Sequence, residues 1–204
     1  MAKLPEPPHP LTVAPELVPL RTRQRLWRIY FAGGPHPVTW RDFRTFGPTN
    51  ARFDHHDKPP HTQTKGILYA AVDPVTCLAE VFQATRTIDR AATAPWLVAF
   101  DIARDVSLLD LMGTWPTRAG ASMAINSGPR PRARRWSQAI YAAYSMVEGL
   151  RYGSSMHANK PCVAVYERAR SALPSAPSFH RALSDPALLL RLNAAATRLG
   201  YGLV

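Results

Sequence analysis

The chain has 204 residues, 46% of them hydrophobic, which suits one folded domain with a sizeable core. No apolar run approaches the roughly 18 residues of a membrane span, and the first ten residues lack the apolar core of a signal peptide. The formal net charge of +11 favours an anionic partner, which could be nucleic acid, a phosphorylated small molecule or an acidic protein. Cys77 and Cys162 are far apart in apolar surroundings, so we expect no disulfide framework and a reducing cytoplasm.

The first third of the chain predicts one strand between two irregular segments. Residues 1–20 are proline-rich and are expected to form an extended arm. Residues 26–31 alternate in polarity and predict a strand, which ends at Gly33-Gly34-Pro35. Residues 35–65 are polar and rich in proline and histidine. An irregular segment of this length in a folded domain is usually functional or mobile.

Residues 66–86 are the most informative stretch, because they predict a short buried strand followed by a helix. Asp73 is a good N-cap residue, and Pro74 suits the first helical position, where its missing N–H costs nothing. The apolar residues that follow recur at helical spacing. Glu80 lies off this apolar stripe, among small and apolar neighbours, which makes it a functional candidate.

The second half of the chain predicts an alternation of strands and helices, with no internal repeat. Gly149 is expected to stop the first helix, and Gly200 is expected to close the second, which begins at Asp185-Pro186. The predicted strands cover residues 96–102, 106–111 and 162–166, and the predicted helices cover residues 136–148 and 185–199.

Histidines and carboxylates gather in one polar loop, which raises the question of a metal site. His55, His56 and His61 lie there with Asp54 and Asp57. Structural zinc sites use cysteines or two well-separated pairs of ligands, and neither pattern is present. We therefore expect no metal.

Basic residues cluster at residues 21–25 and 130–135. Neither cluster adjoins a helix-turn-helix, a zinc finger or a motif for stacking single-stranded bases. The sequence therefore favours a chain that does not bind nucleic acid by itself.

Four motifs in order resemble the RES domain, a family named for its characteristic Arg, Glu and Ser. They are Leu-Trp-Arg-Ile-Tyr at 26–30, Ala-Arg-Phe-Asp at 51–54, Leu-Tyr…Asp-Pro…Leu-Ala-Glu-Val at 68–81, and Gly-Leu-Arg-Tyr-Gly-Ser at 149–154. The third motif is the most specific. The resemblance implies a single α+β domain similar to the ADP-ribosyltransferase fold, with central mixed β-sheets flanked by helices.

Carried over residue by residue, the resemblance places Arg28, Arg52, Tyr69, Glu80 and Ser154 in a site that binds NAD as a substrate. Arginine forks pair well with the pyrophosphate, and an aromatic face can stack on nicotinamide. The carboxylate would stabilise a cationic ribose, and the serine hydroxyl would orient the amide or the ribose. Taken singly, these residues also fit plainer roles: a surface arginine, a core tyrosine, a solvated glutamate and a turn serine.

The sequence departs from the family pattern in two places. Arg52 lacks the usual preceding glycine, and residues 55–65 look like an insertion, so the loop over the site should differ in shape. Ser155 is an alternative to Ser154 for the motif serine.

The resemblance implies a toxin of a bacterial toxin–antitoxin pair that cleaves the nicotinamide–ribose bond of NAD by hydrolysis or phosphorolysis. An ADP-ribosyltransferase with a protein or nucleotide target is the first alternative, and a non-catalytic basic module that binds nucleic acid is the second. The expected protein partner is a helix-turn-helix antitoxin of the Xre type, and the oligomeric state of their complex is left open. The expected organisation is the arm at 1–20, a catalytic domain at 21–170, and a C-terminal helical extension at 171–204.

Overall fold

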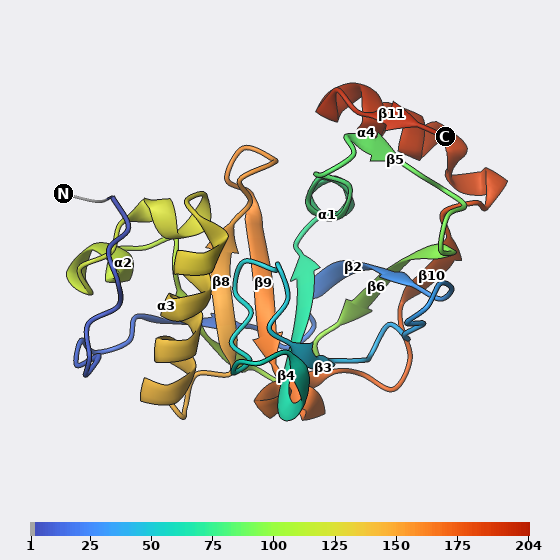
Figure 1. The fold of residues 1–204 in the computed structure, drawn as a ribbon. Coiled ribbons are helices and arrows are strands. Elements are labelled where there is room, and N and C mark those ends of the chain that lie inside the picture. The colour runs from blue at the N-terminus through green and yellow to red at the C-terminus, as the bar shows by residue number, and fades with distance from the viewer. Residues whose placement is uncertain (1–2) are drawn as a thin grey trace.

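Nine strands within residues 3–204, the part of the chain that the computed structural model describes, form one mixed sheet (Figure 1). Their order is β1-β7-β8-β9-β4-β2-β6-β10, with β3 paired to β4. Only β7 and β8 run parallel within this sheet. The strands are β1 (Leu17–Leu20), β2 (Arg25–Phe31), β3 (Arg44–Gly47), β4 (His61–Ala71), β6 (Pro95–Asp101), β7 (Val106–Asp110), β8 (Gly149–Gly153), β9 (Pro161–Tyr166) and β10 (Phe179–Ala182).

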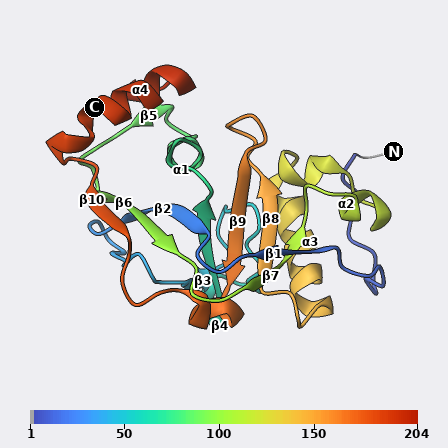
Figure 2. The same ribbon diagram turned by 180° about the vertical axis from the view of Figure 1, so that it is seen from behind.

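The helices gather at two ends of the molecule. Longer α3 lies beside β8 and short α2 lies beyond it at the same end, whereas α4 lies at the opposite end next to α1 and the C-terminus (Figures 1 and 2). A small parallel pair, β5 and β11, joins α4 to the segment after α1. The bounds are α1 (Pro74–Val81), α2 (Trp115–Arg118), α3 (Arg130–Ala143), α4 (Leu189–Leu199), β5 (Thr87–Ile88) and β11 (Gly202–Leu203). The predicted α+β class with a mixed sheet is confirmed.

The large sheet is nearly divided between β2 and β4. These strands share a single residue pair, Trp27 with Ala71, whereas β2 pairs with β6 over its whole length. Beyond that pair the two halves of the sheet diverge. Helix α1 follows β4 directly and packs against both β2 and β4, so it lies at the point of divergence.

Successive residues of β4 face two separate hydrophobic cores. Ile67 and Ala71 pack in the core that includes α1, α3 and α4, and Tyr69 packs against it. Leu68 and Ala70 belong to the core on the other face of the sheet. This alternation is the period-two pattern of a strand that is buried on both faces.

Helix α1 begins as predicted. The Asp73 side chain accepts a hydrogen bond from the Thr76 N–H at 2.9 Å, and Pro74 occupies the first turn. At the C-terminal end of α4, Gly200 adopts a left-handed conformation with φ of 66°, which suits glycine. The start of that helix is less regular than predicted, because a 3₁₀ turn (Pro186–Leu188) precedes Leu189.

The predicted helix over residues 136–148 is displaced, because α3 spans Arg130–Ala143. Gly149 does not stop a helix. It is the first residue of β8, and a Cβ there would lie 2.6 Å from the Ala164 carbonyl oxygen, so glycine permits close contact with β9. The segment 35–65, expected to be irregular, contains β3 and the first residues of β4.

The segment before β2 packs on the rest of the domain. Leu4 and Leu11 are buried in the core around α3, and the Trp136 indole donates to the Pro5 carbonyl at 2.8 Å. Residues Leu17–Leu20 form β1 and pair with β7. The division of the chain at residues 20 and 170 stays a prediction.

Asp54, His55 and His56, the residues that suggested a metal loop, are completely buried. Asp54 accepts hydrogen bonds from the His56 ring at 2.5 Å and from the Thr49 backbone at 2.6 Å, and it forms an ion pair with Arg44. Within residues 3–204 no group of three or more His, Cys, Asp or Glu side chains is arranged to hold a metal.

His55 should make the protein less stable as the pH falls. Its ring stacks on Tyr141 at 4.3 Å, neither ring nitrogen has a hydrogen-bond partner within residues 3–204, and burial lowers its pKa to about 3. The His55 ring of the unfolded chain therefore takes up a proton near pH 6.5, whereas in the folded chain the ring stays neutral until about pH 3. The free energy of unfolding should fall by about 1.4 kcal/mol per pH unit between pH 6.5 and 3.

Urea unfolding at several pH values would measure this slope, and a His55→Phe variant provides the comparison. The variant keeps an aromatic ring against Tyr141 but cannot take up a proton, so its slope should be flatter. Asp54 contributes only below about pH 4, because its pKa is depressed, and it does so in both proteins. Equal slopes between pH 6.5 and 4.5 would contradict the assignment to His55.

Candidate active site

A cavity of about 290 Å³ brings together Arg52, Tyr69 and Glu80, three of the residues that the sequence predicted. It opens into a smaller apolar pocket of about 70 Å³, which also contacts Tyr69 and Glu80. This smaller pocket lies where β2 and β4 diverge, between Ile29 on β2 and Cys77 on α1. Ser155, not Ser154, is the serine that lines the larger cavity.

Ser154 holds the Glu80 carboxylate from behind the cavity. Its hydroxyl donates to Glu80 Oε1 at 2.5 Å and accepts from the backbone N–H groups of Met156 and His157, at 3.1 and 3.0 Å. The residue is only 2% exposed. Two N–H donors fix the hydroxyl, so its one proton points at the carboxylate. A Cβ at the preceding Gly153 would overlap the Asn159 side chain, which would have to move.

A second set of hydrogen bonds ties the serine turn to the start of α1. The Thr76 hydroxyl donates to Asp73 Oδ2 at 2.6 Å and lies 2.8 Å from His157 Nδ1. Because the hydroxyl proton is used on Asp73, the ring nitrogen of His157 must supply the donor of the second bond. The turn after β8 and the helix that carries Glu80 are therefore held together at two points.

Two arginines form the basic side of the cavity. Arg52 donates to the Gly128 carbonyl at 2.5 Å, and Arg130, the first residue of α3, donates to Gln83 at 2.6 Å. Burial lowers the pKa of Arg52, the charge of Arg130 lowers it further, and Glu80 opposes the shift. Glu80 therefore lies near the Arg52 guanidinium, and it lines the same cavity as Arg130.

The aromatic side of the cavity is formed by Tyr69 and Tyr152, both of which line the two pockets. Burial raises the pKa of each hydroxyl well above its usual range. The Tyr69 hydroxyl has no hydrogen-bond partner within residues 3–204. This hydroxyl oxygen is itself buried, so it is not exposed to a ligand in the cavity.

Arg28, the fifth predicted site residue, does not line either pocket. Its guanidinium donates to the carbonyls of Trp40 and Asp42, at 3.2 and 3.0 Å, and burial lowers its pKa to about 10. Its positive charge also opposes the rise that burial causes in the pKa of Cys77. Arg28 therefore lies near Cys77, which lines the apolar pocket, and its guanidinium is hydrogen-bonded to the 32–43 loop.

Several residues that line the cavity were not predicted from the sequence. Arg130 belongs to a run that the sequence marks only as a basic cluster, and Tyr152 lies inside the quoted Gly-Leu-Arg-Tyr-Gly-Ser motif. No local pattern marks Gln83 or Asn126. Asn126 donates to the Leu111 carbonyl at 2.9 Å, so its amide is already engaged in supporting the cavity wall.

The mixed sheet is nearly divided between β2 and β4, and helix α1, which carries Glu80, lies at the division. Together with the cavity lined by polar and aromatic residues, these features define an α+β domain. The RES domain family matches residues 25–186, and the chain belongs to this family. Among solved structures, the chain is similar in fold to one described as the crystal structure of the M. tuberculosis MbcT-MbcA toxin-antitoxin complex. The match has a TM-score of 0.54 and 19% identity, and it covers 84% of this chain and 89% of the other. No curated protein sequence matches the chain.

Within residues 3–204, no helix has both the length and the apolar character to span a bilayer.

Proposed function

We propose that this RES protein is a toxin that destroys NAD by cleaving the bond between nicotinamide and ribose. The observation that carries the proposal is the Glu80 carboxylate, fixed by buried Ser154 at the meeting point of a basic and an aromatic surface. A site that only bound phosphate would gain nothing from a carboxylate at this position. A reaction that develops positive charge on a sugar does gain from it.

The reaction asks for little acid catalysis, because nicotinamide leaves as a neutral molecule. Bond cleavage leaves a cation-like ribose, and Glu80 would stabilise that charge and accept a hydrogen bond from a ribose hydroxyl. Water or inorganic phosphate then attacks the anomeric carbon and gives ADP-ribose or its 1-phosphate, with loss of one proton. Fixed charge in a partly enclosed site needs no reorganisation during the reaction.

The remaining cavity residues supply binding. Arg52 and Arg130, which both line the cavity, would hold the pyrophosphate. Tyr69 and Tyr152, which line both pockets, would enclose the nicotinamide ring. Arg28 lines neither pocket, so it would contribute positive charge near Cys77 and would not bind the pyrophosphate.

A chain that consumes NAD without restraint would harm the cell that makes it, so the proposed function includes a protein inhibitor in the cytoplasm. The structural neighbour is a toxin–antitoxin complex, which supports this part of the proposal. We take the inhibitor to be the expected helix-turn-helix antitoxin of the Xre type, with any contact to DNA made by that partner.

The test is nicotinamide release from NAD by the purified, partner-free chain, with and without inorganic phosphate. Release is expected, and a requirement for phosphate would identify the acceptor. Folded protein that releases no nicotinamide under either condition would refute the proposed activity.

Arg52→Lys should weaken substrate binding more than it slows the reaction. Lysine keeps the charge but loses the planar fork that can engage two phosphate oxygens and the Gly128 carbonyl together. We expect KM for NAD to rise about 10-fold or more, with kcat changed only a few-fold. Steady-state kinetics would check this, and an unchanged KM would remove Arg52 from the pyrophosphate site.

A further inference from the structure

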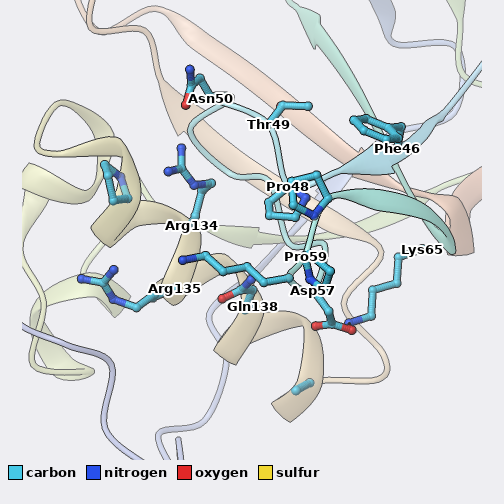
Figure 3. Close-up of a pocket in the computed structure, with 14 residues that line it drawn as sticks. Phe46, Pro48, Thr49, Asn50, Asp57, Pro59, Lys65, Arg134, Arg135 and Gln138 are labelled. Carbon is cyan, nitrogen blue, oxygen red and sulfur yellow. Dashed lines mark hydrogen bonds and ion pairs between the residues drawn. The ribbon is translucent and has the colours of Figure 1, made fainter.

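A groove of about 1300 Å³ lies beside the candidate active site, between α3 and the segment that carries β3 and the loop to β4 (Figure 3). The side chains of Arg134 and Gln138 project from α3 on the side that faces Pro48 and Pro59. Asn50 lines both this groove and the cavity. On α3, Arg130 lines the cavity and Pro131 lines the groove, so the two depressions adjoin.

The groove is larger than a small-molecule site, which usually measures about 300–1,000 Å³. Its walls include four prolines and the side chain of Phe46, which is 51% exposed. Prolines offer no backbone N–H, so a bound segment cannot pair along them as an added strand. Recognition would therefore rest on side chains, with Phe46 as an apolar contact. Arginine and aromatic residues are the types that dominate binding energy at protein interfaces.

Some of the positively charged side chains that line the groove have no acidic partner within residues 3–204. Lys65 pairs with Asp57 at 2.6 Å, and Arg135 pairs with Glu6, also at 2.6 Å. Arg134 and Lys58 line the groove, and neither forms an ion pair or side-chain hydrogen bond with another residue of the described chain 3–204. Unpaired cations in a depression attract a ligand that carries negative charge.

We propose that this groove is the docking site of the inhibitory protein, which would insert an acidic segment with an apolar side chain against Phe46. The inference rests on the proposed function and adds to it the surface and the chemistry of the partner. Carboxylates of the segment pair with Arg134 and Lys58, and its end lies over Asn50. A segment seated there covers the mouth of the cavity, whereas Arg134 and Lys58, the two charges that bind it, lie outside the cavity.

The test uses a double charge reversal, Arg134→Glu with Lys58→Glu, and the product of the gene that adjoins this chain's gene as the probe. Binding is measured by titration calorimetry, and inhibition by nicotinamide release. We expect affinity and inhibition to fall about 100-fold, while the isolated variant consumes NAD within two-fold of the unchanged chain. Arg191→Glu, an exposed charge reversal on α4, is the matched control and should change neither.

Three outcomes would overturn the proposal: an unaltered affinity of the double variant, no binding of the probe to the unchanged chain, or a raised KM for NAD in the isolated variant. The last result would show that the groove holds the adenosine half of the substrate. Calorimetry measures the affinity of the probe for the groove even if no NAD is consumed. Failure of the proposed activity is therefore distinguishable from failure of the docking site.

Discussion

Glu80→Gln should reduce nicotinamide release from NAD about 10³-fold, which corresponds to about 4 kcal/mol of lost transition-state stabilisation. Glutamine has nearly the same shape, and its carbonyl oxygen can still accept the hydrogen bond from Ser154. What the variant loses is the negative charge that faces the ribose as it becomes cationic. Because that charge develops only in the transition state, the loss should appear in kcat rather than in KM.

The measurement compares initial rates of nicotinamide release by the two proteins and their thermal unfolding. Glu16→Gln is a matched control, because the Glu16 carboxylate lies outside the cavity and accepts hydrogen bonds from Thr114. It should leave the rate unchanged. A folded Glu80→Gln protein that retains more than a tenth of the rate would rule out Glu80 as the group that stabilises the cation.

Features that depend on neighbouring residues were the ones that the sequence predicted well. Asp73, Pro74 and the apolar repeat act within two turns of one helix, so the start of α1 follows from them directly. The same is true of Gly200 at the end of α4. Glu80 stood out because its own neighbours are small or apolar, which is again a local property.

Features that depend on the meeting of distant segments were missed or misread. The local sequence predicts a helix stop at Gly149, but glycine is needed there because a Cβ would clash with the Ala164 carbonyl oxygen on the adjacent strand. The α3 boundary was misplaced because its first turn is a run of arginines and proline with no apolar repeat. Arg130 reaches the cavity only because α3 begins beside it, and no spacing within residues 130–135 encodes that.

The geometry of Ser154 illustrates the same limit in the site itself. The family motif names the serine and leaves open whether it touches the substrate. The structure buries it behind Glu80, from which it is separated by 74 positions in the chain. Ser155, its neighbour, faces the cavity. By its contacts, Ser154 positions the Glu80 carboxylate.

Ser154→Ala should lower kcat for NAD consumption about 10- to 100-fold with little change in KM, because the hydroxyl orients the carboxylate and does not reach the cavity. The backbone N–H groups of Met156 and His157 also lose their acceptor, so about 1–3 kcal/mol of stability should be lost. Ser155→Ala is the matched control and should change kcat less than three-fold. If instead Ser154→Ala raises KM and leaves kcat intact, the serine binds the substrate directly and the carboxylate is held by α1 alone.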